Sequence, residues 1–220
     1  MGNTTPTVGW QSSPSQLKLD YLKRYAVGET ALDVGCGRGW YAAALANAGF
    51  RVSAVDSERS FDDGRVHFTE ALIVSSLPYP DAAFDTVVMF DILEHLSAEG
   101  AILDEIARVC KHRLILSVPH ADDGFLPHYG LTYLHRTDHT HEREYTPDSL
   151  CEKLEAHHFK TLHVALEGRT HIPLVFSEFV RGGRVVRTMM QWFITALYKI
   201  GIVTNPHIAG DIFWVGDKCA

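Results

Sequence analysis

The stretch Ala31-Leu-Asp-Val-Gly-Cys-Gly-Arg-Gly-Trp40 decides the fold of this chain. It joins the end of a short apolar strand to a turn with alternating glycines, Gly35, Gly37 and Gly39, and an alanine-rich segment follows up to Gly49. Glycine permits unusual backbone dihedrals and a close approach to a ligand. The stretch therefore predicts a strand, a turn that can hold a nucleotide-type cofactor, and a helix. A tight strand-to-helix turn without a ligand is the alternative.

Predicted strands and helices alternate outward from this stretch. Parallel strands need crossover connections, which are usually helices that cover both faces of the sheet. The alternation therefore predicts an α/β fold with a largely parallel sheet, whose ligands bind at the carboxyl ends of the strands. The expected strands are Thr30–Val34, Arg51–Val55, Val66–Thr69, Phe84–Phe90, Arg113–Val118, Thr161–Leu166 and Ile212–Gly216, and the expected helices are Ser15–Tyr25, Trp40–Ala48, Ala98–Cys110 and Pro147–His157.

The composition predicts one domain over residues 1–220. The chain is 46% hydrophobic and 21% charged, which is ordinary for a globular domain. Residues 1–14 are rich in Gly, Thr, Ser and Pro and are expected to be flexible. They lack the basic and apolar regions of a secretory signal, which favours the cytoplasm. The four cysteines form no C-x-x-C pair, so neither a disulfide framework nor a structural zinc site is predicted.

The charge distribution limits which classes of binding partner are expected. A net charge of −7 argues against nucleic-acid binding, which needs clustered Lys and Arg to neutralise phosphates. Residues 160–220 nevertheless carry 7 basic and 4 acidic side chains. An anionic partner is therefore expected at the C-terminal third.

Asp56 strengthens the case for a cofactor. It ends the second predicted strand, where a carboxylate can accept hydrogen bonds from both hydroxyls of a ribose. A dinucleotide fingerprint also uses an acidic residue roughly 20 positions after its glycines, so a nicotinamide-dependent reductase is an alternative. That fingerprint needs a last glycine where Trp40 stands, which favours a different cofactor.

Three segments together resemble the class I S-adenosylmethionine-dependent methyltransferases of the type 11-like group, which includes ubiquinone-biosynthesis and glycan-associated O-methyltransferases. Leu32–Gly39 looks like the first motif of that family and Ala54–Asp56 like the second. Leu77–Asp85, followed by Thr86–Leu96, resembles the segment around the fourth strand. The resemblance implies a Rossmann-like, doubly wound, seven-stranded, mainly parallel sheet with a reversed C-terminal strand. Segments 15–25 and 126–145 would act as lids.

The resemblance also implies which residues hold S-adenosyl-L-methionine. Asp33 and the glycine turn would surround its methionine part, Asp56 would hold its ribose, and Ser57 would neighbour its adenine. Glu70, Ala71 and Leu72 compete for the position after the third strand. Residues after the fourth strand would close over the sulfonium. The full implied set is Asp33, Gly35, Cys36, Gly37, Gly39, Asp56, Ser57, Ala71, Leu72, Phe90, Asp91 and Ile92.

A divalent cation is a further possibility at Asp91-Ile-Leu-Glu-His95. The ubiquinone-type enzymes have a similar E-x-x-E-H arrangement, which has been associated with a divalent cation. Asp91, Glu94 and His95 offer oxygen and nitrogen ligands that could bind one metal ion. Glu94 could instead cap or brace a helix.

The segment His120–Tyr145 concentrates histidines at positions 120, 128, 135, 139 and 141. Histidine titrates near neutrality and can accept a proton from a substrate hydroxyl. His120 directly follows the fifth predicted strand. His141-Glu-Arg-Glu-Tyr145-Thr resembles the H-x-R-x-Y-T segment of glycan-associated members, which forms part of their substrate face. We therefore predict that His120 or His141 is the general base. Zinc at Asp138-His-Thr-His141 is a weaker alternative, because further ligands are not evident.

Residues 181–204 predict an apolar helical insertion preceded by arginines. Arg184, Thr188, Gln191, Thr195 and Lys199 fall on one narrow stripe of the helix, and the rest is apolar. The segment is too short and too interrupted to span a bilayer, which needs about 20 apolar residues. It is expected either to pack against the domain or a second subunit, as in a homodimer, or to contact a membrane surface or a lipid-linked substrate.

Together these observations predict a methyltransferase that acts on a hydroxyl of a sugar, glycan precursor or other small molecule. The histidines favour a hydroxyl over an amine, because a neutral amine needs no base before it attacks. Polyphenol, quinone-precursor and natural-product acceptors are alternatives. Other classes are a reductase dependent on NAD(P) and a cofactor-binding protein without turnover.

Overall fold

The computed structural model describes residues 13–74, 76–121, 138–169, 183–200, 202 and 209–219. The described helices are α1 (Gln16–Tyr25), α2 (Trp40–Asn47), the 3-10 helix η1 (Leu93–His95), α3 (Glu99–Val109), α5 (Pro147–Ala156) and α7 (Arg184–Lys199). The strands are β1 (Thr30–Val34), β2 (Arg51–Asp56), β3 (Val66–Glu70), β4 (Phe84–Phe90), β5 (Cys110–Pro119), β6 (Phe159–Arg169) and β7 (Ala209–Lys218).

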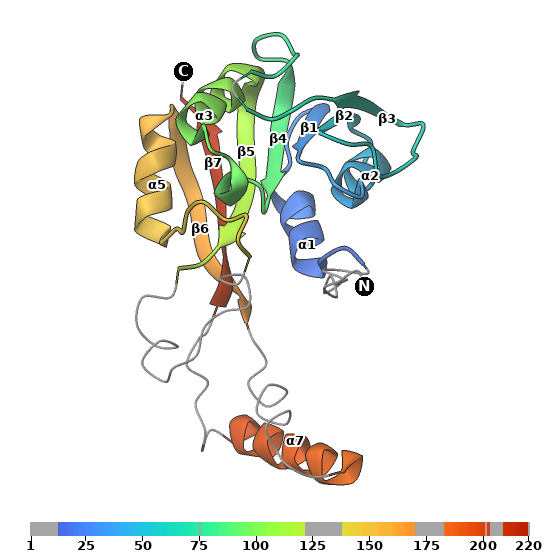
Figure 1. The fold of residues 1–220 in the computed structure, drawn as a ribbon, viewed down its shortest axis with the longest axis vertical. Helices are drawn as coiled ribbons and strands as arrows, with labels where there is room; N and C mark the ends of the chain where they lie inside the picture. Colours follow the sequence, from blue (N-terminus) through green and yellow to red (C-terminus); the bar gives the residue numbers. More distant parts are fainter. Residues whose placement is uncertain are drawn as a thin grey trace, which may run out of the picture.

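The strands form one seven-stranded sheet in the order β3-β2-β1-β4-β5-β7-β6. The first five strands in the chain pair in parallel, whereas β7 lies antiparallel between β5 and β6. This arrangement confirms the predicted Rossmann-like sheet with its reversed C-terminal strand (Figure 1). The strand order reverses beside β1, between β1 and β4, which is where open α/β sheets bind ligands.

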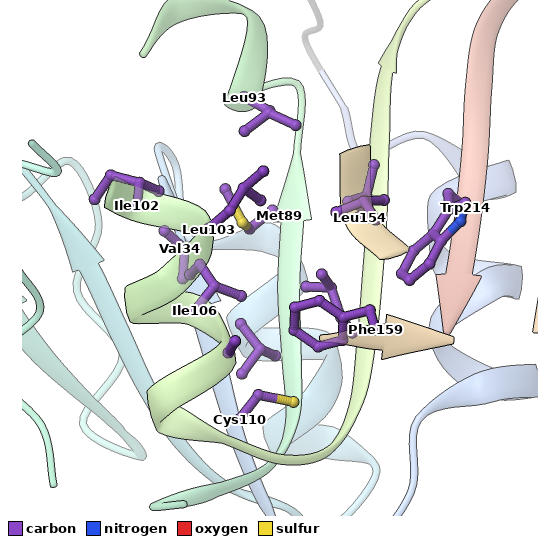
Figure 2. Close-up of a cluster of buried hydrophobic side chains, with 14 of the residues drawn as sticks. Val34, Met89, Leu93, Ile102, Leu103, Ile106, Cys110, Leu154, Phe159 and Trp214 are labelled. Carbon is purple, nitrogen blue, oxygen red and sulfur yellow. The ribbon is translucent and has the colours of Figure 1, made fainter. Parts of the chain in front are cut away.

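A hydrophobic core covers each face of the sheet. On one face, Ile102, Leu103 and Ile106 of α3 point toward Met89 of β4 (Figure 2). The same cluster continues to Leu154 of α5 and to Phe159 and Trp214 of the last two strands. Truncation of such buried side chains typically costs 2–5 kcal/mol, so this face fixes α3 and α5 to the sheet.

On the other face, α1 and α2 pack against the sheet. Tyr21 and Leu22 of α1 and Leu45 of α2 are buried in a second cluster with Phe213 of β7. The ring of Tyr21 lies 4.3 Å from that of Phe213, measured between centroids. The N-terminal helix is thereby fixed across the middle of the sheet, close to the ends of β4 and β5.

All the parallel strands end at one edge, the carboxyl edge. Asp56, Phe90 and Pro119 lie at or beside the ends of their strands there. Because β7 runs in reverse, it begins at this edge, where Asp211 pairs with Pro119. The carboxyl edge therefore gathers residues from both halves of the chain.

Several predictions about the organisation of the chain concern residues that the structure does not describe. Residues 1–12 and 122–137 are not described, so the flexible start and most of the expected lid at 126–145 remain predictions, as do the places of His128 and His135. The expected helix within 181–204 is present over Arg184–Lys199. Among the described helices, none combines the length and the apolar character that crossing a bilayer requires.

Candidate cofactor and acceptor site

The glycine turn is built from left-handed backbone. Gly35, Gly37 and Gly39 have φ values of 71°, 46° and 71°. The amide of Gly35 donates to the carbonyl of Val55 at 2.9 Å, which ties the turn to β2. A Cβ at Gly35 would overlap with the side chain of Ile92. Glycine is required here because the left-handed conformation and the lack of space both exclude a side chain. The turn and the segment after β4 are thus in direct contact.

Asp56 lies beside this turn. One carboxylate oxygen accepts a hydrogen bond from the backbone amide of Gly37 at 2.8 Å. The other accepts from the backbone amide of Ser57 at 2.7 Å, and the hydroxyl of Ser57 donates to it at 3.3 Å. Each carboxylate oxygen has two lone pairs, so acceptor capacity remains for the hydroxyls of a ribose.

The positions after β3 differ in exposure. The amide of Ala71 donates to the carbonyl of Asp56 at 2.9 Å, and the side chain of Ala71 is partly buried against the core. Leu72 is exposed over 72% of its surface. Ala71 therefore lies next to the end of β2, whereas Leu72 offers an apolar side chain at the open side of the same edge.

Asp33 and Cys36 are buried beneath the turn. Among the described residues, one carboxylate oxygen of Asp33 has no hydrogen-bond partner. Burial, with a smaller contribution from the charge of Asp56, raises the pKa of Asp33 to about 7, against the opposing effect of the hydrogen bond from the backbone amide of Ala42. Such a carboxyl would be ionised most readily if a cation bound beside it. Burial also raises the pKa of the Cys36 thiol to about 12, so this cysteine is a packing group and not a thiolate nucleophile.

The segment after β4 carries an ion pair. Asp91 has a φ of 53°, which turns the chain sharply after Phe90. Its carboxylate accepts from the hydroxyl of Ser117 at 2.7 Å and pairs with the ammonium of Lys18 from α1. That ammonium also lies 5.4 Å from the ring centre of Phe90 and 5.8 Å from that of Tyr41. Helix α1 thus delivers a cation to the carboxyl edge.

The predicted metal ligands are separated. Ligand atoms of Glu94, His95 and His141 lie within 4.8 Å of one another, whereas Asp91 pairs with Lys18. Neither carboxylate oxygen of Glu94 has a hydrogen-bond partner within the described part of the chain, and the side chain is 1% exposed. Burial raises the pKa of Glu94 to about 8, as does the charge of Asp91. His141, which was not among the predicted ligands, lies with Glu94 and His95 in this group. The order of residues along one turn could not show this, because His141 comes from a distant segment.

His120 lies at the end of β5 and is tied to β7. Its amide donates to the carbonyl of Gly210 at 2.9 Å, and its Nδ1 lies 3.2 Å from the carbonyl oxygen of Ala209. A carbonyl oxygen can only accept, so Nδ1 carries the hydrogen in this contact. The neutral imidazole then has its lone pair on Nε2, which is the tautomer of a general base.

Two residues of the H-x-R-x-Y-T segment make structural contacts within the domain. Arg143 donates to the carbonyls of Leu96 and Ser97 and pairs with Glu99 at 3.4 Å. The hydroxyl of Tyr145 donates to the buried carboxylate of Glu99 at 2.5 Å. Its arginine and tyrosine therefore brace the start of α3. His141, by contrast, lies beside His95, with 4.6 Å between the ring centres.

These features converge on one family. Residues 11–164 match the family model described as "Methyltransferase domain". The chain belongs to the class I S-adenosylmethionine-dependent methyltransferases. This finding confirms the resemblance carried by the three sequence segments and favours it over the nicotinamide-dependent alternative.

The names of two curated relatives of this methyltransferase specify an oxygen position. It is 32% identical over 109 residues to a ubiquinone biosynthesis O-methyltransferase from Thiobacillus denitrificans, which covers 45% of this chain and 47% of that protein. It is 35% identical over 97 residues to the 27-O-demethylrifamycin SV methyltransferase of Amycolatopsis mediterranei, over 38% of this chain and 35% of that protein. The chain thus spans about half or less of the length of these relatives.

A solved structure shares the fold of the methyltransferase. The 1,6-didemethyltoxoflavin-N1-methyltransferase of Burkholderia thailandensis, with bound 1,6-didemethyltoxoflavin and S-adenosylhomocysteine, has a TM-score of 0.57. Its sequence identity is 21%, and the match covers 93% of this chain and 76% of that one. At this identity the likeness supports the fold alone.

Two charged residues at the carboxyl edge of the methyltransferase were not among the predicted site residues. Lys18 is 5% exposed, although it stands in an amphipathic helix. Its spacing to Tyr21, Leu22 and Tyr25 follows the buried stripe of that helix, which was the available signal. Asp211 of β7 has its pKa raised to about 6 by burial and by the charge of Asp91, while Lys18 lowers it. Nothing near Asp211 in the sequence marks it, because β7 reaches the site only by its reversal.

Proposed function

We propose that this protein transfers the methyl group of S-adenosyl-L-methionine to a hydroxyl oxygen of a small molecule. The observation that supports the proposal is the arrangement of two carboxyls around the left-handed glycine turn. Asp56, at the end of β2, accepts a hydrogen bond from Gly37 of the turn. Asp33 is buried beneath the turn, and one of its carboxylate oxygens has no hydrogen-bond partner among the described residues. The cofactor carries a ribose diol, an ammonium and a sulfonium. These groups match a carboxylate at the open edge and carboxyls buried beneath the turn.

The protein has two tasks in such a reaction. The sulfonium methyl is already activated, so the enzyme mainly aligns the acceptor with it and excludes water. For a hydroxyl acceptor it must also take a proton. We assign that role to His120, because its contact with the Ala209 carbonyl leaves the lone pair on Nε2. His141 is the second candidate and differs from His120 by its place in the Glu94–His95–His141 group.

Substitution of each histidine tests this assignment. Loss of the base should lower turnover by at least a hundredfold and leave the affinity for S-adenosylhomocysteine nearly unchanged. We expect this result for His120→Ala and a smaller effect for His141→Ala. Exposed His139, on the same segment as His141, provides the matched control. Near-normal turnover of both the His120 and His141 variants from pH 6 to pH 9 would remove the base from the mechanism.

The acceptor we propose is electrically neutral. Asp33, Asp91, Glu94 and Asp211 surround Lys18 and form an acidic cluster at the carboxyl edge. Lys18 is already paired with Asp91, so an anionic acceptor would gain no new ion pair from this cation, whereas hydroxyl groups can donate hydrogen bonds to carboxylates and accept them from protonated carboxyls. Sugars and glycan precursors satisfy this condition, and so do neutral polyphenols and natural products. The oxygen acceptors named for two relatives support O-methylation.

We further propose that Glu94, His95 and His141 hold a divalent cation. The two unpartnered oxygens of buried Glu94 and the imidazoles of two histidines suit a cation of borderline hardness. Such an ion would lower the pKa of an acceptor hydroxyl. An assay of methyl transfer in excess chelator distinguishes the proposed reaction from the proposed cation. Full activity there would leave S-adenosylmethionine-dependent transfer standing and remove the cation.

The acceptor is identified most directly by transfer of a tritiated methyl group. Extracts of the source cell are incubated with the protein and S-adenosylmethionine labelled in the methyl group, and the labelled product is then exposed to alkaline pH. We expect a neutral, base-stable methyl ether. A product that releases methanol would indicate a methyl ester and thus an acidic acceptor, which contradicts the proposal. Cofactor binding without any labelled product would favour a non-catalytic role.

A further inference from the structure

Helix α7 exposes most of its apolar residues. Val185, Met189, Trp192 and Phe193 are exposed over 72%, 67%, 76% and 60% of their surfaces. Their spacing places them on one side of the helix, because residues three, four and seven positions apart share a face. Single exposed apolar residues are ordinary, but a continuous face of this kind marks a contact with a partner or a membrane.

The polar side of α7 is basic. Arg184 and Arg187 stand on it with Thr188, Gln191 and Thr195. From Phe179 to Gly210 the sequence contains four Lys or Arg residues and no Asp or Glu, in a chain whose net charge is −7. This segment is therefore the part of an acidic protein that an anionic surface attracts.

The length and composition of α7 fit a helix that lies in a membrane surface. Sixteen residues extend about 24 Å, which is less than the hydrocarbon core of a bilayer, about 30 Å. Interfacial helices combine Trp, Phe and Leu on one side with Lys and Arg on the other. Trp192 next to Phe193, with arginines in the first turn, has this combination.

We propose that α7 binds the surface of an anionic lipid bilayer, with its apolar side inserted between the head groups. A second copy of the chain is the other occupant that an apolar face admits. Pairing of α7 with α7 would bring arginines together without a carboxylate from either helix, since Arg184–Lys199 contains no acidic residue. An anionic surface satisfies the apolar and the basic side at once.

The position of the insertion gives this contact a consequence for the site. β6 ends at Arg169, which pairs with Ala209 at the start of β7. The chain therefore leaves and re-enters the sheet at the carboxyl edge, where the cofactor site lies. In Figure 1, α7 is on the side of the sheet toward which β4 points. Attachment through α7 would hold the carboxyl edge of the sheet close to the lipid surface. This contact is an inference beyond the proposed reaction.

Vesicle sedimentation tests the contact with the full chain. Vesicles of phosphatidylcholine alone are compared with vesicles in which about a third of the lipid is phosphatidylglycerol. We expect binding to the anionic vesicles, weakened by salt, and a blue shift of the tryptophan emission that is lost in Trp192→Ser. Arg184→Gln with Arg187→Gln should weaken binding about thirtyfold, because each arginine near an anionic surface contributes roughly fivefold.

Matched controls separate this result from misfolding and from dimerisation. Arg51→Gln removes an arginine with a 75% exposed side chain at the opposite edge of the sheet and should leave vesicle binding unchanged. All variants should keep their affinity for S-adenosylhomocysteine. Equal binding to neutral and anionic vesicles would overturn the proposal. So would a dimer, seen by light scattering, that Trp192→Glu dissociates and that does not bind vesicles.

Discussion

Replacement of Asp33 by asparagine should stabilise the cofactor-free protein at alkaline pH. Burial raises the pKa of this carboxyl from 3.8 to about 7. Between these values the folded state keeps a proton that the unfolded chain has released, so stability falls as pH rises through the window. The penalty is complete above pH 7 and absent below pH 4. Asparagine has the same shape and no charge to bury.

The size of the effect follows from the pKa. A rise from 3.8 to about 7 corresponds to about 4 kcal/mol of unfolding free energy, of which about 2–3 kcal/mol is lost between pH 5 and pH 8. For a chain of this length, 1 kcal/mol shifts the melting temperature by about 2–4 °C. The advantage of Asp33→Asn over the wild type should therefore grow by roughly 5–10 °C from pH 5 to pH 8.

Thermal melts of both proteins across pH 4 to 9 measure this difference. Other buried carboxyls, such as Glu94 and Asp211, titrate in both proteins and cancel in the comparison. The same substitution should weaken S-adenosylmethionine binding by at least tenfold, because an ammonium loses a charged acceptor. A melting difference that stays constant from pH 5 to pH 8 would refute the claim that Asp33 is held protonated by burial.

Three further predictions concern the frame of the site. Gly35→Ala should destabilise the protein by about 1–3 kcal/mol, measured by urea unfolding, because its left-handed backbone and its contact with Ile92 leave no room for a Cβ; equal stability would contradict the geometry. Asp85→Ala should cost about 2–4 kcal/mol at pH 7, since the carboxylate accepts from two backbone amides and a threonine hydroxyl. These hydrogen bonds hold the pKa of Asp85 below its ordinary value of 3.8, so that contribution should be lost as pH falls below 3.8, and a pH-independent cost would argue against it. Tyr145→Phe should lower stability by about 1 kcal/mol through the lost bond to Glu99, with little change in cofactor affinity; a large loss of affinity would place Tyr145 in the site instead.

Much of the fold could be predicted because its signals are local. A few consecutive residues are enough to predict the apolar strands β1 and β4 and the alanine-rich helix α2. The glycine turn determines how β1 connects to α2. The ends were less exact. β5 begins at Cys110, three residues before the expected strand, because Cys110 already pairs with Phe84 of β4. Pairing with a neighbouring strand is a tertiary effect that single-sequence patterns do not contain.

The candidate site likewise contains contacts between neighbouring elements, which the sequence can indicate, and contacts between distant segments, which it cannot. The contact of Asp56 with Gly37 joins residues in consecutive elements, so spacing along the chain could indicate it. Lys18 reaches Asp91 across 73 positions, and His141 reaches His95 across 46. These partners meet only because α1 crosses the sheet and because the segment before α5 returns to η1. Sequence spacing within one turn therefore grouped Asp91 with Glu94 and His95, whereas in the folded chain His141 lies beside Glu94 and His95 and Asp91 pairs with Lys18.

Calorimetric titration with S-adenosylhomocysteine tests the central claim most directly, because it needs no acceptor. The wild-type protein should bind one equivalent and should not bind NAD. Asp56→Ala should bind at least tenfold more weakly, since hydrogen bonds to a charged acceptor are worth about 1.5–3 kcal/mol each. Failure of the wild type to bind S-adenosylhomocysteine, or unchanged affinity in Asp56→Ala, would contradict the assignment of the carboxyl edge as the cofactor site.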